Sequence, residues 1–245
     1  MTSQTHRFPR FFVTVPSPCP YLPDRMERKL FTELRGADAA ELHDILTHYG
    51  FRRSQNVAYR PACDGCNACL SARIRVADFE LKRWARKTLK ANEDLTAEVI
   101  DPWVTDEQYY LLKHYLGTRH AESGMASMGP YDYTAMVEDT PVQSMLTEYR
   151  TPSTGMDEPS NLIAVCLSDR LSDGLSMVYS FFDPDATERS LGTYMILEHI
   201  ARARRLGLKY VYLGYWIENC RKMQYKARFQ PLEILGQNGW RPSPE

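Results

Sequence analysis

The chain has 245 residues, of which 43% are hydrophobic and 25% charged, and its formal net charge is −1. This is enough for a substantial core in one large domain or two small ones, so the fold needs no metal or disulfide to hold it together. No run approaches the eighteen or so apolar residues of a membrane span, and the N-terminal stretch lacks the apolar segment of a secretory signal. We therefore expect a cytoplasmic protein with reduced cysteines and no membrane partner.

Residues 38–50, DAAELHDILTHYG, predict the first helix. Asp38 stands at the N-cap with Glu41 three residues later, which is the spacing of a capping box. Apolar residues recur along one face, and Gly50 suits the position just after the helix.

The next two predicted strands, at residues 51–60 and 70–79, enclose a loop with three cysteines at intervals of three, Cys63, Cys66 and Cys69. This spacing indicates a metal or cluster site, although three thiolates are one ligand short of a closed four-coordinate site. The motif does not fix the metal, and a metal-free or oxidised loop is the alternative.

A basic helix is predicted at residues 82–95, followed by a short strand that ends near residue 100. Its cations are Lys82, Arg83, Arg86, Lys87 and Lys90. Their pattern suits either a solvated helix face or a polyanion site. We place a domain boundary near residue 100, which divides the chain into residues 1–100 and 101–245.

The second half begins with a helix at residues 105–120, where Thr105 and Gln108 form a capping box. A surface loop is expected at residues 150–160. The elements predicted after it are strands at 161–170 and 174–183, a helix at 190–207, and strands at 208–216 and 231–235. The strand–helix–strand order is a βαβ unit, so the expected class is α/β, with α+β character overall.

The helix of this unit begins with Arg189-Ser190-Leu191-Gly192-Thr193-Tyr194. The turn resembles the R/Q-x-x-G-x-G/A turn of the GNAT acetyltransferases, in which backbone N–H groups hold the pyrophosphate of acetyl-coenzyme A. Tyr194 replaces the last small residue and should crowd a pyrophosphate. The resemblance thus implies a GNAT-like fold whose acyl donor is not acetyl-coenzyme A. For the turn taken alone, an ordinary helix start is the alternative.

Longer motifs from both halves together resemble the arginyl-tRNA–protein transferase family over about residues 10–235. They are CPYLPDR at 19–25, GFRRS at 50–54, YRP at 59–61, FDPD at 182–185, SLGTY at 190–194, YLGYWI at 212–217 and CRKMQYKARF at 220–229. The short bacterial branch, the aspartate/glutamate leucyltransferases, fits best in length and in the cysteine loop. The resemblance implies an N-terminal cysteine-containing domain and a C-terminal GNAT-like acyltransferase domain.

The activity that the resemblance implies is transfer of leucine from leucyl-tRNA to proteins with an N-terminal Asp or Glu, which marks them for N-end rule degradation. Arginine as the donated residue stays open. A leucine pocket should be apolar and an arginine pocket should carry a carboxylate, for which the acidic stretch of residues 132–188 is the candidate source. Weaker alternatives are a coenzyme A-dependent N-acetyltransferase and a metal-containing RNA-binding module. The implied partners are aminoacyl-tRNA and the acceptor protein, the enzyme is expected to be a monomer, and no cofactor is required.

In GNAT-like folds the acyl group lies where two central strands part. Tyr179, Ser180 and Tyr215, on the strands flanking the predicted helix, are therefore the candidate polar walls of the catalytic site. Asp183 is a candidate for orienting the acceptor amine, although in Asp-Pro-Asp it equally suits a turn.

Substrate-binding candidates are Ser190 and Gly192 at the helix entry, and a group of cations for the acceptor carboxylate. These cations are Arg119, His120, Lys226 and Arg228. Arginine suits a carboxylate through its two-pronged donor geometry, but Lys226 and Arg228 could equally meet tRNA phosphate. With the family in view, the five cations of the basic helix are assigned to the tRNA backbone.

Cys19 precedes Pro-Tyr at a position where eukaryotic relatives have the first cysteine of a CxxC pair, and Cys69 matches one cysteine of their Cys-Cys pair. In those relatives the thiols are linked to an iron–sulfur cluster. Cys19, Cys63, Cys66 and Cys69 together restore a count of four thiolates, which suits an iron–sulfur cluster or a structural zinc.

Overall fold

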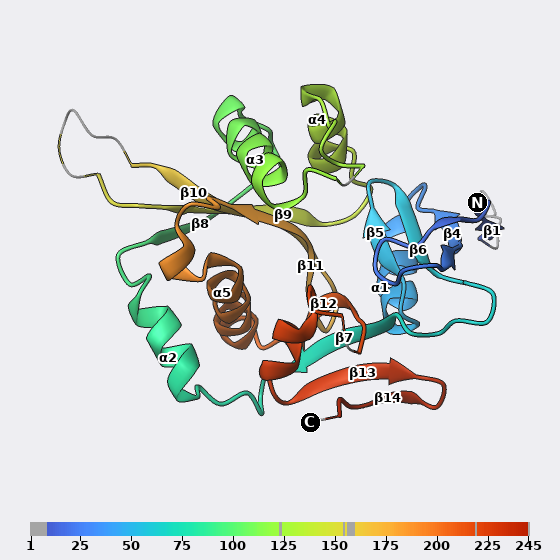
Figure 1. Ribbon diagram of the computed structural model, residues 1–245. Helices are drawn as coiled ribbons and strands as arrows, with labels where there is room; N and C mark the ends of the chain where they lie inside the picture. Colours follow the sequence, from blue (N-terminus) through green and yellow to red (C-terminus); the bar gives the residue numbers. More distant parts are fainter. Residues whose placement is uncertain (1–8, 123, 154, 156–159, 219, 245) are drawn as a thin grey trace, which may run out of the picture.

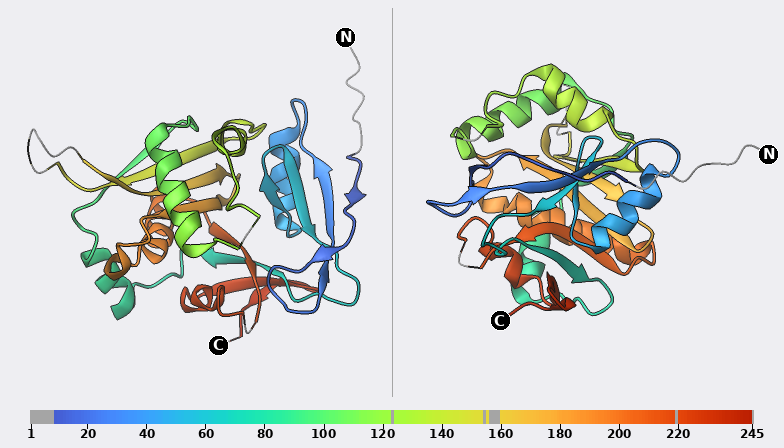
Figure 2. Two further views of the ribbon diagram at one scale, coloured as in Figure 1. Left: turned by 45° about the horizontal axis from the view of Figure 1, so that its top comes forward. Right: turned by 90° about the vertical axis from the view of Figure 1, so that its right-hand side faces the viewer.

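The computed structural model describes residues 9–122, 124–153, 155, 160–218 and 220–244, and shows two main sheets with helices packed around them (Figure 1). The smaller sheet comes from the N-terminal segment and stands beside the larger one (Figure 2). The mixed α/β class expected from the sequence is confirmed.

The smaller sheet has four antiparallel strands in the order β1 (Phe12–Val13), β4 (Lys29–Glu33), β6 (Val57–Pro61) and β5 (Arg52–Ser54). Helix α1 (Ala39–His48) packs on it, and a short ribbon pairs β2 (Ser17–Pro18) with β3 (Met26–Glu27). The prediction of one strand over residues 51–60 is wrong. The segment is a β5–β6 hairpin, because Gln55 adopts a φ of 51° and reverses the chain.

The larger sheet has eight strands. In spatial order they are β14 (Gly239–Pro242), β13 (Leu232–Gly236), β7 (Leu70–Arg75), β12 (Tyr210–Trp216), β11 (Gly174–Phe182), β10 (Leu162–Arg170), β9 (Ser144–Arg150) and β8 (Thr96–Ile100). Of these described pairings only β11 with β12 is parallel. The parallel pair is joined by α5 (Leu191–Arg205), as the βαβ prediction requires.

Both faces of the larger sheet are covered by helices. Helix α5 and α2 (Arg83–Lys90) pack on one face, while α3 (Asp106–Arg119) and α4 (Pro130–Glu138) pack on the other (Figure 1). Alternation along β10 divides its side chains between the two cores: Cys166 faces α5, and its neighbours Val165 and Leu167 face α3 and α4. Two short 3-10 helices, η1 (Thr187–Arg189) and η2 (Gln224–Arg228), precede α5 and β13.

The structure confirms two of the predicted helix-end features and only part of a third. Thr105 and Gln108 form the expected capping box, with Gln108 N donating to Thr105 Oγ1 at 3.3 Å and Thr105 N to Gln108 Oε1 at 3.2 Å. Gly50 follows α1 with a φ of +84°, as predicted. Asp38 is the N-cap of α1, but its side chain makes no capping hydrogen bond because its ψ of 3° departs from the extended backbone that such a cap needs.

Sheet membership along the chain changes between β6 and β7, not at residue 100. Strand β7 lies between β12 and β13, so the segment after the cysteine loop already belongs to the larger sheet. The domain boundary near residue 100 stays a prediction. No helix in the described ranges is long and apolar enough to cross a membrane.

Candidate active site

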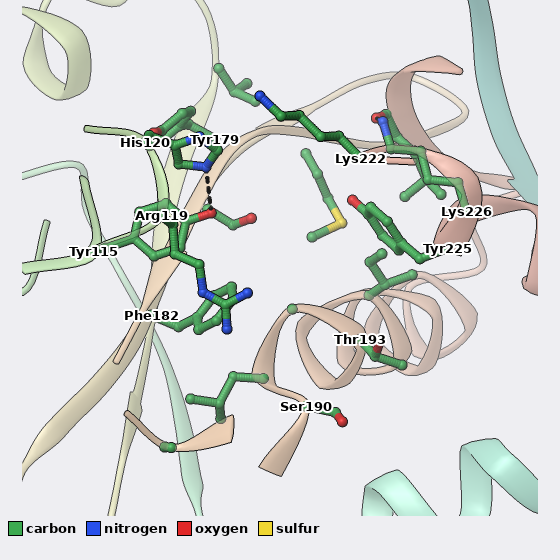
Figure 3. Close-up of a pocket in the computed structure, with 18 of the residues that line it drawn as sticks. Tyr115, Arg119, His120, Tyr179, Phe182, Ser190, Thr193, Lys222, Tyr225 and Lys226 are labelled. Atoms are coloured by element: carbon green, nitrogen blue, oxygen red, sulfur yellow. Dashed lines mark hydrogen bonds between the residues drawn. The ribbon is translucent and has the colours of Figure 1, made fainter. Parts of the chain in front are cut away.

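The central feature of the larger sheet is a gap between its two parallel strands. Strands β11 and β12 pair only from Gly174–Tyr210 to Ser176–Tyr212. Past this point a cavity of about 610 Å³ opens between them, with α5 as its floor (Figure 3). At the mouth of the gap β11 carries one extra residue, Val178, where its register against β10 shifts. The expected parting of the two strands is confirmed.

Two cations, Lys226, which is buried, and Arg52, which is half-buried, satisfy the carbonyl groups that the parted strands leave without strand partners. Arg52 Nη2 donates to the carbonyl of Val178 on β11 at 2.9 Å. Lys226 Nζ donates to the carbonyls of Leu213 and Tyr215 on β12 at 2.8 and 2.6 Å. Because buried carbonyls without partners are costly, these side chains stabilise the open form of the gap.

Gly214 allows Arg52 to reach this position. It has a φ of +73°, and a Cβ added there would lie 2.5 Å from Arg52 Cζ. A larger residue would therefore displace the guanidinium. Burial and the nearby Arg52 charge lower the pKa of Lys226 to about 7.

Three further basic side chains reach the cavity near the ends of α3 and β12. They are Arg119, His120 and Lys222 (Figure 3). Burial lowers the pKa of His120, and the charges of Lys222 and Arg119 lower it further. Among the described residues that line the cavity, none is Asp or Glu. The described lining is therefore cationic, and the described part of the acidic stretch at residues 132–188 supplies it with no carboxylate.

Aromatic hydroxyl groups complete the polar lining. Tyr115 Oη lies 3.2 Å from His120 Nε2, and Tyr179 and Tyr225 also line the cavity. Burial raises the pKa of Tyr115 and Tyr179 above the ordinary value and that of Tyr225 to about 12. All three phenols are thus neutral hydrogen-bond donors at physiological pH.

The structure brings most of the predicted site residues together around this one cavity. Those that line it are Arg119, His120, Tyr179, Ser180, Ser190, Gly192 and Lys226. Ser190 is the N-cap of α5, but its side chain makes no capping hydrogen bond. A Cβ on Gly192 would lie 3.3 Å from Phe182 Cε1, so glycine here permits the close packing of Phe182 against the helix start.

Tyr215 is not a wall of the cavity. Its hydroxyl lies 3.3 Å from the carbonyl of Gly50 and 3.0 Å from that of Tyr59, so it points into the smaller sheet. The prediction of a catalytic position is wrong because the register shift on β12 after Tyr212 turns this side chain away from the gap.

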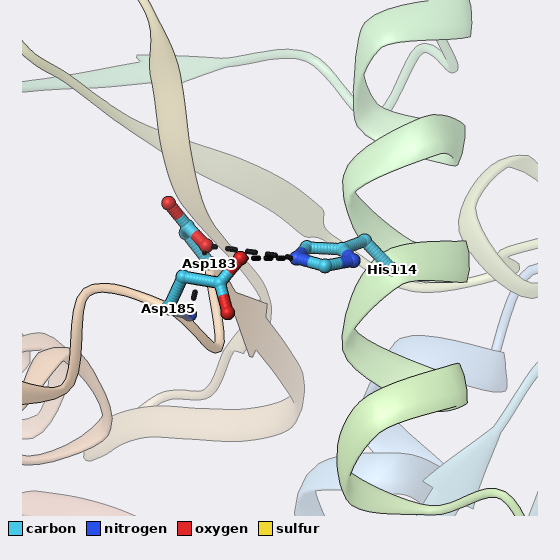
Figure 4. Close-up of side chains that lie close together, drawn as sticks. All are labelled: His114, Asp183 and Asp185. Atoms are coloured by element: carbon cyan, nitrogen blue, oxygen red, sulfur yellow. Dashed lines mark hydrogen bonds and ion pairs between the residues drawn. The ribbon is translucent and has the colours of Figure 1, made fainter.

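Asp183 also lies outside the cavity lining. It forms a small exposed cluster with His114 and Asp185, in which His114 Nε2 is 2.9 Å from Asp185 Oδ2 and 3.9 Å from Asp183 Oδ1 (Figure 4). Asp185 N donates to Asp183 Oδ1 at 3.0 Å, which is the turn-forming role considered as the alternative.

Arg228 lies with the basic helix and not with the cavity. Its guanidinium carbon is 4.2 Å from the ring centroid of Trp84, a residue of α2. The predicted tRNA-binding cations are all exposed on this helix: Lys82, Arg83, Arg86, Lys87 and Lys90. The position of Arg228 therefore favours the phosphate alternative over the acceptor carboxylate.

The expectation about Tyr194 is wrong. Its side chain is only 5% exposed and packs edge-on against Tyr149, with 5.6 Å between ring centroids. It belongs to the core on the sheet side of α5, so it cannot crowd a ligand at the helix start.

The four cysteines of the N-terminal half converge. Cys19, Cys63, Cys66 and Cys69 line one cavity of about 80 Å³. Burial raises the pKa of the Cys69 thiol to about 12, and the other three thiols add to the shift. In the described part of the chain, no three of these sulfurs lie within 4.8 Å of one another. That spacing is wider than the about 3.8 Å that Zn–S bonds of about 2.3 Å would impose on a tetrahedral site.

Two cations that line the cavity were not predicted from the sequence. Arg52 and Lys222 both stand inside quoted motifs, GFRRS and CRKMQYKARF, but neither motif shows which of its cations faces the gap. Tyr115 was missed because the predicted helix gave no sign of which side meets β11.

The comparisons with known proteins agree with this geometry. Residues 17–87 match the N-terminal part of the arginine-tRNA-protein transferases, and residues 107–236 match the C-terminal part. A protein of Nitrobacter winogradskyi named aspartate/glutamate leucyltransferase is 55% identical over 244 residues, which cover 98% of this chain and 94% of the relative. A protein of the same name from Parvibaculum lavamentivorans is 55% identical over 245 residues, covering 100% and 99%.

Solved structures are similar only at a low level. The crystal structure of FemX has a TM-score of 0.49 and 8% identity, covering 79% of this chain and 64% of its own. The sequence matches carry the conclusion, since they extend over nearly the whole chain: the chain belongs to the arginine-tRNA-protein transferase family.

Proposed function

We propose that this protein transfers leucine from leucyl-tRNA to the N-terminal amine of proteins that begin with Asp or Glu. This is the activity in the names of relatives that are 55% identical over nearly their full length. The observation that carries the proposal is the gap between β11 and β12, whose described lining combines apolar side chains with cations and holds no carboxylate. The product would carry a destabilising N-terminal leucine and enter N-end rule degradation.

The walls of the gap favour leucine over arginine as the donated residue. Met177, Leu191, Ile196 and Leu213 supply apolar surface to the cavity. An arginyl group would bring a guanidinium that needs a carboxylate or other acceptors, and it would meet Arg52 and Lys226 instead.

The reaction requires the two substrates to be positioned, and it does not require covalent catalysis. An aminoacyl ester is already activated, so we expect neither an enzyme intermediate nor a cofactor in the transfer itself. The acceptor amine must lie about 3–3.5 Å from the ester carbonyl, and the developing oxyanion needs preorganised donors. Beyond Ser176 the edge of β11 toward β12 is not paired with that strand, so its outward N–H groups face the gap. Tyr179 and Ser180, on this stretch, are our candidates for the polar contacts.

The tRNA would approach along α2. Its exposed cations lie beside the start of α5, because Asn92 Nδ2, just after α2, donates to the carbonyl of Arg189 at 2.8 Å. Arg189 is held there by Asp94, with its two terminal nitrogens 2.8 and 2.9 Å from the carboxylate oxygens. These contacts support a tRNA path along α2, from which the aminoacylated end would enter the gap beside Ser190 and Gly192.

We further propose that Cys19, Cys63, Cys66 and Cys69 hold an iron–sulfur cluster. The four convergent thiols supply the ligand count of a cluster, and a structural zinc is the alternative. When bound, it would supply a redox-sensitive link between the β2–β3 ribbon and the loop before β7. Anaerobic reconstitution should give iron and sulfide in the wild type and lose both in Cys19→Ser, but not in Cys220→Ala, which lies outside this cavity.

A direct assay tests the function. Purified protein is incubated with tRNA charged with labelled leucine or labelled arginine, and with peptides that begin with Asp, Glu or Lys. Leucine should pass to the Asp and Glu peptides, with arginine transfer and the Lys peptide at background. Transfer of arginine in preference to leucine would contradict the donor, and modification by acetyl-coenzyme A without tRNA would contradict the reaction. We place this reaction in the cytoplasm, where tRNA is charged, and a monomeric enzyme stays a prediction.

A further inference from the structure

We propose that Lys222, with His120 and Arg119, forms the receptor for the side-chain carboxylate of the acceptor's N-terminal Asp or Glu. This inference rests on the proposed function, because it names the part of the same cavity that selects the acceptor. The three residues come from two elements about one hundred residues apart in sequence, the end of α3 and the loop after β12. All three line the cavity. His120 and Lys222 lie at one end of it, and the guanidinium of Arg119 extends along the wall to Phe182, with Cζ 5.6 Å from the ring centroid (Figure 3).

The charges of this group favour an anionic ligand. Burial lowers the pKa of His120, and the charges of Lys222 and Arg119 lower it further, so the imidazole is neutral at physiological pH. Lys222 and Arg119 carry like charges and repel each other. No Asp or Glu among the described lining residues offsets that repulsion. Gathering like charges costs free energy, and a bound carboxylate would remove this cost and gain charge-assisted hydrogen bonds.

The position of the group favours the acceptor over the tRNA. The exposed cations of α2 lie beside the start of α5, so the tRNA backbone reaches the cavity from the side of Ser190. His120 and Lys222 lie at the opposite end of the cavity from Ser190 (Figure 3). Tyr179 and Ser180 also line the gap, and we expect the ester to lie along this stretch of β11. The acceptor therefore enters from the end that His120 and Lys222 occupy.

The chemistry of the receptor accounts for the choice of acceptor. Arg119 and Lys222 are exposed and have long side chains, so they can follow a carboxylate that is one methylene nearer or farther, as in Asp and Glu. An Asn side chain has the shape of Asp but no charge, and it would leave the cations unpaired. A site built for a charged group rejects such an analogue strongly.

Steady-state kinetics with leucyl-tRNA and two peptides, beginning with Asp or Asn, test the assignment. Lys222→Met and Arg119→Met should each raise KM for the Asp peptide by about 10- to 100-fold, the range for a lost hydrogen bond to a charged group. The preference for Asp over Asn should fall by a similar factor. KM for leucyl-tRNA should stay unchanged. Arg221→Met is the matched control, since it removes an exposed cation next to Lys222 that does not line the cavity.

The outcomes separate the possible failures. If the Asp-over-Asn ratio is unchanged in both variants while the wild type transfers leucine, the receptor assignment is wrong and the proposed function stands. A rise in KM for tRNA alone would make the group a phosphate site and would also overturn the assignment. If the wild type transfers leucine to neither peptide, the proposed function itself fails. Both substitutions are on exposed side chains, and a thermal melt of each variant verifies that the fold is intact.

Discussion

Arg53 on β5 and Asp169 on β10 form a fully buried ion pair that joins the two sheets across 116 residues of chain. Nε donates to Oδ2 at 2.7 Å and Nη2 to Oδ1 at 2.6 Å, and neither side chain is exposed. His43 Nε2 lies 3.1 Å from the same carboxylate, and Ser144 Oγ donates to it at 2.7 Å. Arg52, which precedes Arg53 on β5, reaches into the gap. The Arg53–Asp169 pair therefore also anchors the strand that stabilises the candidate active site.

Breaking this pair from one side should destabilise the protein strongly. Arg53→Met leaves the Asp169 carboxylate buried without its main partner, and we expect the free energy of unfolding to fall by about 3–5 kcal/mol in urea denaturation. Arg35→Met is the control, because Arg35 pairs with Glu33 at the surface and its loss should cost less than about 1 kcal/mol. Equal losses in the two variants would contradict the role of burial.

The same carboxylate should contribute to the pH dependence of stability. Burial alone would raise the pKa of Asp169, but His43 and Arg53 outweigh it and lower that pKa to about 2. An Asp whose pKa falls on folding stabilises the fold above its unfolded pKa of about 3.9, and this contribution is lost as the pH falls toward 2. We expect Asp169→Asn to flatten the free energy of unfolding between about pH 4 and pH 2, measured in urea at each pH. An unchanged slope would refute the shift.

Gly214→Ala adds only a methyl group, but it should lower both stability and leucine-transfer activity. The positive φ costs a non-glycine residue about 1–2 kcal/mol, and the new Cβ would displace Arg52 from the gap. We expect a loss in stability of at least that size and a fall in leucine transfer beyond what unfolding explains. Gly117→Ala, in α3 with no atom within 4 Å of the added Cβ, should instead gain about 0.5–1 kcal/mol. Full transfer activity in folded Gly214→Ala would show that Arg52 is not needed at the gap.

Two tyrosine substitutions distinguish the cavity from the sheet interface. Tyr179→Phe removes a hydroxyl that lines the gap, and we expect kcat/KM for leucine transfer to fall about 10-fold or more. Tyr215→Phe removes a hydroxyl that contacts carbonyls of the smaller sheet, so it should cost about 1 kcal/mol of stability and leave transfer nearly intact. The reverse pattern would return Tyr215 to the catalytic site.

The basic face of α2 should control the salt dependence of tRNA binding. Replacing Lys87 and Lys90 together with Gln removes up to two phosphate contacts, so the slope of log K against log salt should become shallower by up to about 2. Replacing Arg205 and Lys209 with Gln is the control, since both are exposed, Arg205 as the last residue of α5 and Lys209 just after the helix. Filter binding at several salt concentrations measures both. Identical slopes in the two double variants would show that α2 does not carry the tRNA.

The sequence by itself determined the local elements and the family. The capping box at Thr105 and Gln108, the glycine after α1 and the strand β10 follow from side-chain chemistry within a few residues, so they could be predicted. The strand–helix–strand unit around α5 and the ordered motifs on both sides of it gave the parted strands and the transferase family.

Only the tertiary structure decided which faces meet. Strand β7 pairs with β12 and β13, which follow it by well over one hundred residues, and nothing local encodes such a pairing. The register shift on β12 sends Tyr215 into the smaller sheet, and the core face of α5 takes Tyr194. Periodicity shows which residues share a face, but the position of that face depends on contacts between distant segments. For this reason Arg52 and Lys222 became visible as parts of the cavity only in the folded chain.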